Sequence, residues 1–189
     1  MGIRQVLQSL IPGNRDQAEE DDFEFLRQVS IFKGLSEDQL RKIHARMDKK
    51  AFEAGKPIIR EGEIDVENTM YILKTGTVGI TKAVTLKISQ TETAQKEKSF
   101  IRLTGAMRPF FGEMSMFEEK GERSATVMPM DDCTVFVISK KALEELAVED
   151  PAIGYVIVTN ITRVLCDRLR KTNNDVLTLT TALSLALSR

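Results

Sequence analysis

The sequence predicts a mainly β fold with flanking α-helices. The expected architecture is a double-stranded β-helix, or jelly-roll barrel of double Greek-key topology, with N-terminal helices and a long C-terminal helix. Between residues 50 and 139 the chain consists of short segments rich in β-branched and aromatic residues, separated by glycine-containing, charged turns. This spacing is typical of an antiparallel sandwich or barrel. On both sides of this region, apolar residues return at helical spacing.

The N-terminal part predicts a short segment followed by two helices. Residues 1–22 hold an amphipathic stretch, a Pro12-Gly13-Asn14 breaker and an acidic run at 19–22. A solvated linker is the favoured interpretation of the acidic run, and the start of the next helix is the alternative. Apolar residues at positions 23, 26, 29 and 32 indicate one helical face. Ser36 then caps a second helix, and Gln39 completes a capping box.

Eight candidate strands follow this helical part. Their ranges are 50–53, 57–61, 69–74, 77–83, 85–89, 99–104, 124–130 and 133–139. Pro57 stands at the beginning of its segment, where the missing N–H does least harm to a sheet. The polar segment from Ser89 to Ser99 is interpreted as the tip of an extended hairpin.

The C-terminal part predicts a short helix and then a long one. The long helix begins at Asp150-Pro151, because proline is tolerated at the first helical position. Its apolar stripe comprises Ile153, Val156, Ile157, Ile161, Val164, Leu165 and Leu169. This stripe can bury against the barrel or pair with a second copy, and nearby Asn160 is either exposed or sets the register of a dimer. For residues 176–187 a helix is favoured over a strand.

These elements divide the chain into three regions. They are an N-terminal segment at 1–22, a β-barrel domain at 23–149, and a C-terminal hinge or dimerisation helix with its tail at 150–189. As a helix, the uncharged residues 176–187 would span ~18 Å, which is short of the roughly 30 Å core of a membrane. We therefore expect no membrane segment and a cytoplasmic protein.

Composition and side-chain inventory argue against several functions. The chain has 27 basic and 28 acidic residues, a balance that provides no electrostatic footprint for nucleic acid. Cys133, Cys166 and the single His44 form neither a disulfide framework nor a metal-ligand set. The two cysteines are interpreted as buried, reduced thiols. Because no catalytic Ser/His/Asp or Cys/His set is recognised, we do not expect an enzyme.

The most informative segment lies between Phe111 and Arg123. Phe111-Gly112-Glu113 precedes a short expected helix, whose first N–H groups and dipole favour an anion. Gly112 lets the backbone approach that anion closely, and Arg123 can grip two phosphate oxygens with its planar guanidinium. Glu113 would repel a phosphate and is better suited to accept hydrogen bonds from sugar hydroxyls. A ligand with one phosphate and one ribose fits this pattern.

This segment resembles the phosphate-binding cassette of cyclic nucleotide-binding domains. Residues 112–125 match the cassette pattern, and residues 58–63 and 71–78 match two further blocks of the family in the same order. The resemblance covers about residues 23–175 and is closest to the members that are like the catabolite activator protein and the kinase regulatory subunits. It implies a jelly-roll fold, an Arg123 that pairs with the exocyclic phosphate, and a Glu113 that accepts from the ribose 2′-hydroxyl.

The resemblance also implies the remaining ligand contacts. Gly112, Met114 and Ser124 would contribute backbone or hydroxyl contacts, although Met114 and Met116 are interpreted chiefly as core packing. Thr172 and Asn173, on the long helix, would reach the base, and the alternative is that they are simply the polar end of that helix. The complete candidate set is Phe111, Gly112, Glu113, Met114, Ser115, Arg123, Ser124, Ala125, Thr172 and Asn173.

The function expected from these residues is a cyclic nucleotide-binding regulatory module. Cyclic AMP is favoured over cyclic GMP, no metal is expected, and ligand binding would reposition the helix from Pro151 to about Asn174. Expected partners are a second copy, through the C-terminal helix, and an unidentified downstream protein. Residues 176–189 are too few for a helix-turn-helix, so direct DNA binding is not expected. The alternatives are a ligand-free interaction module and an oligomerising scaffold that acts through residues 151–187.

Overall fold

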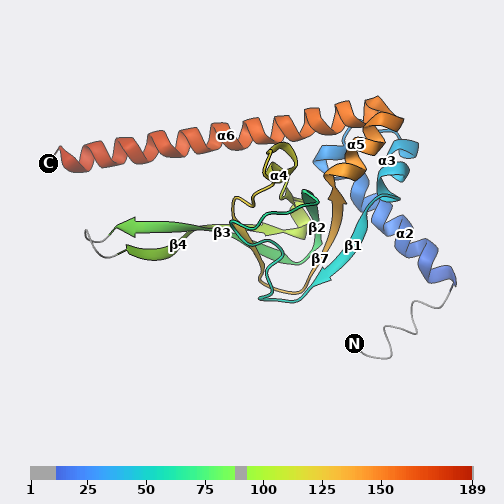
Figure 1. The fold of residues 1–189 in the computed structure, drawn as a ribbon, viewed down its shortest axis with the longest axis horizontal. Helices are drawn as coiled ribbons and strands as arrows, with labels where there is room; N and C mark the ends of the chain where they lie inside the picture. The colour runs from blue at the N-terminus through green and yellow to red at the C-terminus, as the bar shows by residue number, and fades with distance from the viewer. Residues whose placement is uncertain (1–11, 88–92, 189) are drawn as a thin grey trace.

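A computed structural model describes residues 12–87 and 93–188 of the chain. Two antiparallel β-sheets form a barrel, and helices cover one end and one side of it (Figure 1). The first sheet has the order β1-β7-β2-β5, formed by Asp48–Phe52, Cys133–Ser139, Thr69–Thr75 and Phe110–Phe111. The second has the order β4-β3-β6, formed by Thr93–Thr104, Thr77–Lys87 and Thr126–Pro129. The predicted fold class is confirmed.

The strands differ from the predicted ones in four places, the first of which is β5 at Phe110–Phe111, where no strand was predicted. Residues 57–61 lie along the barrel but make only an isolated bridge between Ile59 and Val127. Residues 85–87 of the expected strand at 85–89 continue β3, and the expected strand at 99–104 is the end of β4. No glycine or proline interrupts β3 in this stretch, so it forms a long hairpin with β4. Because β4 begins at Thr93, residues 93–99 of the expected hairpin tip at 89–99 are strand, and residues 88–92 lie outside the described residues.

The N-terminal helix begins earlier than predicted. Helix α2 spans Pro12–Arg27, so Pro12 opens a helix instead of breaking one, as proline tolerates the first helical turn. The acidic run is therefore helical and not a linker. Asp22 is 6% exposed and forms ion pairs with Lys49, at 2.8 Å, and with Lys74. These two lysines project from β1 and β2, so Asp22 holds α2 against the first sheet.

Two apolar clusters hold the fold together. One fills the space between the helices and the outer face of the first sheet, and Phe23, Ile72 and Phe136 belong to it. The other lies between the two sheets and includes Leu73 and Val135, the sequence neighbours of two of these residues. Neighbouring residues enter different clusters because side chains alternate across a strand. Both faces of β2, β5 and β7 are therefore largely buried, whereas β1 is exposed along most of its length.

Short helices connect the barrel to its helical cover. The 3₁₀ helix η1 spans Ser30–Phe32, and helix α3 spans Glu37–His44. The predicted capping box is confirmed, because the Gln39 N–H donates to Ser36 Oγ at 3.3 Å and the Ser36 N–H donates to Gln39 Oε1 at 3.0 Å. Helix α5, Lys140–Glu149, then follows β7.

A single helix, α6, runs from Pro151 to Leu187. Its 37 residues correspond to ~55 Å, so it continues well past the barrel (Figure 1). Residues 176–187 are helical, as favoured. Asn160 is buried, which corrects the expectation that it is exposed: its Nδ2 donates to the carbonyl oxygens of Ile31 at 3.0 Å and Lys33 at 2.8 Å. It therefore anchors α6 to η1.

The two cysteines occupy different environments. Cys133 is buried between the sheets, but Cys166 is exposed on α6, so the expectation of two buried thiols is wrong for Cys166. Within residues 12–87 and 93–188, no helix is long and apolar enough to cross a membrane.

Candidate functional site

Eight of the ten predicted site residues line one cavity. It measures about 150 Å³ and lies between the segment 111–125, which we call the cassette, the barrel wall and α6. Its lining consists of Ile59, Ile80, Phe111, Gly112, Glu113, Met114, Ser115, Glu122, Arg123, Ser124, Ala125, Val127 and Arg168. The two sequence-distant ends of the cassette, around Gly112 and Arg123, therefore meet in space.

Gly112 makes the close approach between these two ends possible. Its φ of +79° lies in the left-handed region that favours glycine. An added Cβ would lie 2.8 Å from Arg123 Nη1 and 3.1 Å from the carbonyl oxygen of Thr69. Helix α4, Met114–Phe117, begins two residues later and has only four residues. Because its dipole is correspondingly small, the positive charge of the site comes mainly from Arg123 and Arg168.

Arg123 is a buried, fixed cation and not an ordinary surface arginine. Its side chain is 5% exposed. Nη1 donates to the carbonyl oxygen of Gly112 at 3.0 Å and to Ser115 Oγ at 2.9 Å. Both acceptors are neutral and both residues line the cavity. Nη1 therefore points toward the space where a ligand would lie.

The other terminal nitrogen of Arg123, Nη2, is held by two hydrogen bonds. Nη2 donates to Asp65 Oδ2 at 2.5 Å and to Thr69 Oγ1 at 2.8 Å. Burial acts to raise the pKa of Asp65, but hydrogen bonds from Thr69 and the Arg123 charge outweigh it, so the pKa lies below its usual value. Asp65 is thus ionised at neutral pH and neutralises Arg123. This partner was not predicted from the sequence, although Asp65 lies just after residues 58–63, one of the segments that match the family pattern.

Glu113 connects the cassette to the C-terminal helix. Its side chain is 5% exposed, and Arg168 Nη1 of α6 donates to its Oε1 at 2.7 Å. Arg168 Nη2 also donates to the carbonyl oxygen of Phe110 at 3.2 Å, and the guanidinium lies 5.0 Å from the Phe110 ring centroid. Sequence reasoning missed Arg168. The available signal was its position one turn before Thr172 on the same helical face.

The remaining predicted residues differ in their placement. Thr172 and Asn173 are exposed on α6 and do not line the cavity; Thr172 Oγ1 donates to the carbonyl oxygen of Arg168 at 3.0 Å. Met116 is buried in the core, as expected. Met114 is instead 45% exposed and lines the cavity, where the Ser124 hydroxyl donates to its sulfur at 3.6 Å.

The arrangement suits a small anion that carries hydroxyl groups. A buried guanidinium faces the cavity on one side, and a buried carboxylate stands on the other. Among the described residues, no group of three or more His, Cys, Asp or Glu side chains could hold a metal ion. Arg123 and Arg168 are the two arginines among the residues that line the cavity, and Arg168 already donates to Glu113.

Comparison with known proteins decides the family. The sequence pattern of the cyclic nucleotide-binding domain matches residues 49–150, which contain the whole cassette. The chain belongs to this family. A solved cyclic nucleotide-binding domain from Methylobacillus flagellatus superposes with a TM-score of 0.66 at 21% identity, over 86% of this chain and 84% of that one. This similarity supports the same fold.

Relatives of greater identity match this chain over only a part of their own length. The cGMP-dependent protein kinase 2 of Mus musculus is 27% identical over 142 residues, which make up 75% of this chain and 17% of the kinase. The cAMP-activated global transcriptional regulator Vfr of Pseudomonas aeruginosa is 40% identical over 70 residues, or 35% of this chain and 31% of the regulator. The chain thus spans only a small part of the length of these relatives.

Proposed function

We propose that this cyclic nucleotide-binding domain is a sensor that prefers cyclic AMP and acts by binding, without catalysing a reaction. The observation that carries the proposal is the meeting of Gly112, Glu113 and Arg123 in one cavity, with Arg168 of α6 beside them. The Arg123-Ser124-Ala125 sequence does not decide between the two nucleotides, because it occurs in a cyclic AMP binder and a hydroxyl residue at position 124 can also help to bind a guanine. The preference for cyclic AMP is supported by the cAMP-activated regulator that is 40% identical over 70 residues, whereas the cGMP-dependent kinase is 27% identical over 142 residues.

The phosphate is recognised by one nitrogen of Arg123. Nη2 stays with Asp65 and Thr69, which fix the plane of the guanidinium. Nη1 now donates to two neutral acceptors, Gly112 and Ser115. An anionic phosphate oxygen is a stronger acceptor than either, since charge-assisted hydrogen bonds are about twice as strong as neutral ones. An oxygen of the exocyclic phosphate therefore replaces one of these neutral acceptors at Nη1, while the guanidinium keeps its orientation.

The ribose is recognised by Glu113. Arg168 uses Oε1 of this carboxylate, and Oε2 accepts the hydrogen bond of the 2′-hydroxyl. The ligand and α6 then both form a hydrogen bond with the buried side chain of Glu113. A base that extends past Arg168 reaches Thr172 and Asn173, which lie about one turn, or ~6 Å, further along the helix.

Signal transmission follows from this shared contact. A ligand shifts a conformational equilibrium only as far as its affinity differs between the two states. Because Arg168 bonds Glu113 directly, nucleotide binding changes the energy of α6 in its present position and repositions residues 151–174. The exposed part of α6 pairs with a second copy, and the resulting dimer presents the signal to a downstream protein.

Isothermal titration calorimetry with cyclic AMP and cyclic GMP tests the proposal. We expect micromolar or tighter binding, stronger for cyclic AMP, and a loss of roughly tenfold to several hundredfold in Arg123→Ala. Arg60→Ala is the matched control, since Arg60 is exposed and pairs only with the neighbouring Glu63 among the described residues. Binding that is unchanged in Arg123→Ala would remove this residue from the site.

A ligand-free interaction module is the second candidate function. Two observations favour it: Arg168 already donates a hydrogen bond to Glu113, and the cavity measures only about 150 Å³. Titrating folded protein distinguishes the two functions, because this module would give no heat with either nucleotide. Glu113→Gln adds a finer test: it should narrow the difference in affinity between cyclic AMP and its 2′-deoxy analogue.

A further inference from the structure

Residues 65–69, which we call the support loop, lead into β2 and lie against the cassette. Asp65 and Thr69 accept the hydrogen bonds of Arg123 Nη2, so the loop fixes this end of the cassette. Asn68 does not itself line the nucleotide cavity. It is half-buried, and its φ of +50° lies in the left-handed region, where residues other than glycine are uncommon. Backbone outliers of this kind cluster at binding sites, so Asn68 is a candidate for a role there.

The side-chain amide of Asn68 joins the support loop to the other end of the cassette. With the amide oriented so that its nitrogen faces these acceptors, Nδ2 donates to the carbonyl oxygen of Ser115 at 2.8 Å and to that of Asp65 at 3.2 Å. Ser115 is 2% exposed and belongs to α4. One amide group therefore connects the cassette helix to the residue that neutralises Arg123.

Helix α4 needs such an external donor. The last four carbonyl groups of an α-helix lack an intrahelical partner, and α4 has only four residues. A buried carbonyl group without a donor costs free energy, and Ser115 is buried. The bond from Asn68 therefore gives this short helix a polar anchor on the side that faces the support loop.

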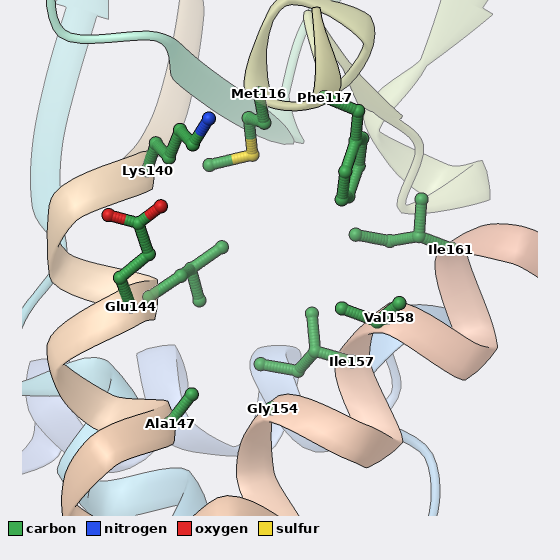
Figure 2. Close-up of a pocket in the computed structure, with 10 residues that line it drawn as sticks. Met116, Phe117, Lys140, Glu144, Ala147, Gly154, Ile157, Val158 and Ile161 are labelled. Carbon is green, nitrogen blue, oxygen red and sulfur yellow. The ribbon is translucent and has the colours of Figure 1, made fainter.

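Another side of α4 borders an open space. There Met116 and Phe117 line a mostly apolar cavity of about 350 Å³, whose other walls are α5 and α6. Figure 2 shows both side chains directed into this space, above α6. Dispersion forces hold an element only where atoms are in contact, so the cavity leaves α4 room to shift. The position of α4 therefore depends on its hydrogen bonds to the support loop and to Arg123.

Arg123 is the second bridge between the support loop and the start of the cassette. Its Nη2 bonds the loop, and its Nη1 donates to the carbonyl oxygen of Gly112 and to Ser115 Oγ. In the proposed function a phosphate oxygen replaces one of the two acceptors of Nη1, which weakens this bridge as the ligand enters. The bond from Asn68 to the Ser115 carbonyl oxygen involves no ligand atom and stays in place.

We infer that Asn68 is a positioning residue of the nucleotide site. Its amide holds α4 at the distance from Arg123 that a phosphate between them requires. This inference rests on the proposed function and adds to it a residue that lies outside the cavity.

The residue type at position 68 meets two requirements at once. Asparagine is among the residues that adopt the left-handed region most readily, and its amide carries a donor. Glycine meets the backbone requirement alone. The carbonyl oxygen of Asn68, which accepts the Lys140 N–H at 3.2 Å, belongs to the backbone and is kept in any variant. Asn68→Gly therefore removes the amide selectively.

Calorimetric titration of the full chain with cyclic AMP tests the role of the amide. Asn68→Gly should lower the affinity roughly fivefold to tenfold, because two hydrogen bonds that fix the cassette are lost. Val66→Gly is the matched control, since Val66 lies in the same loop and is 88% exposed. It should change the affinity less than about twofold. Wild-type affinity of Asn68→Gly would overturn the inference, because the left-handed backbone alone would then suffice.

A double-mutant cycle separates positioning from a general loss of structure. In an Arg123→Ala background the amide has no guanidinium to position, so Asn68→Gly should cause less than about a twofold further loss of affinity. A further loss as large as the one in the wild-type background would show that Asn68 acts independently of Arg123, and would overturn the inference.

Hydrogen exchange of the ligand-free protein keeps this inference separate from nucleotide binding. Without the Asn68 amide, the backbone N–H groups of α4 should exchange at least about fivefold faster, whereas Val66→Gly should leave their rates unchanged. Equal rates in wild type and Asn68→Gly would overturn the inference. A wild-type protein that binds neither nucleotide would contradict the proposed function alone, and the exchange rates would still decide whether Asn68 holds α4.

Discussion

Arg168 on α6 donates a 2.7 Å hydrogen bond to the buried carboxylate of Glu113. This bond joins residues that are 55 positions apart and ties the last helix of the chain to the start of the cassette helix. A second bond, from Arg168 to the carbonyl oxygen of Phe110, fixes the guanidinium against the barrel. The part of α6 beyond Arg168 makes no comparable contact among the described residues. In the proposed function, Arg168 is therefore the contact through which a change in the site would reach α6.

Arg168→Ala should separate nucleotide binding from the response of α6. The substitution removes the bonds to Glu113 and Phe110, but leaves Arg123 and its acceptors in place. We expect the affinity for cyclic AMP to fall less than tenfold. In hydrogen exchange, the ligand-dependent change in protection of residues 151–175 should disappear. Arg170→Ala is the control, because Arg170 is exposed and pairs with Asp167 on its own helix. A full protection change in Arg168→Ala would contradict the coupling.

Eight of the ten residues predicted for the site line one cavity, because the pattern that singles them out is local. Gly112, Glu113 and Arg123 lie within a short stretch, and each residue type indicates a role. Glycine indicates a left-handed turn, glutamate a hydrogen-bond acceptor, and arginine a cation suited to phosphate. Arg168 and Asp65 escaped prediction for the opposite reason. Their roles depend on which face of α6 and which loop the fold brings to the cassette, and no local pattern contains that information.

The fold shows the same division between local and distant information. The Ser36 capping box and the start of α6 at Pro151 follow from residues next to one another. The role of Asp22 does not, because the lysines that bury it come from β1 and β2, far along the chain. The composition of the acidic run at 19–22, taken alone, favours a solvated linker. Tertiary ion pairs give one of its residues a buried position.

Gly112→Ala should impair nucleotide binding more than it impairs stability. Alanine at a φ of +79° carries a strain of about 1–2 kcal/mol. In addition, its Cβ would stand 2.8 Å from Arg123 Nη1 and displace the guanidinium. We expect at least a tenfold loss of affinity for cyclic AMP by calorimetry. Gly55→Ala is the matched control, with a φ of +77° and nothing within 4 Å of the added Cβ. It should show similar destabilisation with unchanged affinity; an equal loss of affinity would refute the steric argument.

Asn160→Leu should loosen the attachment of α6 to the barrel. Leucine has a similar volume but cannot donate to the carbonyl oxygens of Ile31 and Lys33. Leaving buried acceptors without a donor costs roughly 1–3 kcal/mol, which urea unfolding at neutral pH would measure. Asn174→Leu, at an exposed position of the same helix, should change stability little. Wild-type stability of Asn160→Leu would mean that these two bonds contribute no net free energy.

Asp22→Asn should remove a pH-dependent part of the stability. Burial acts to raise the pKa of Asp22, but hydrogen bonds and charges from Lys49 and Lys74 outweigh it, so the folded-state pKa lies below the ordinary 3.8. A lowered folded-state pKa stabilises the fold above the unfolded-state pKa, and this stabilisation is lost as the pH falls through the folded-state pKa. At pH 7 we expect the variant to lose roughly 1–3 kcal/mol of unfolding free energy.

The pH profile of this difference identifies its cause. Urea unfolding of wild type and Asp22→Asn should give a constant difference from pH 7 down to about pH 5, and a shrinking difference below that. The neighbouring Asp21 is exposed, so Asp21→Asn controls for the loss of one negative charge from α2. A difference that stayed constant down to pH 2 would point to lost packing, because protonation abolishes an ion pair but leaves the contacts of the side chain in place.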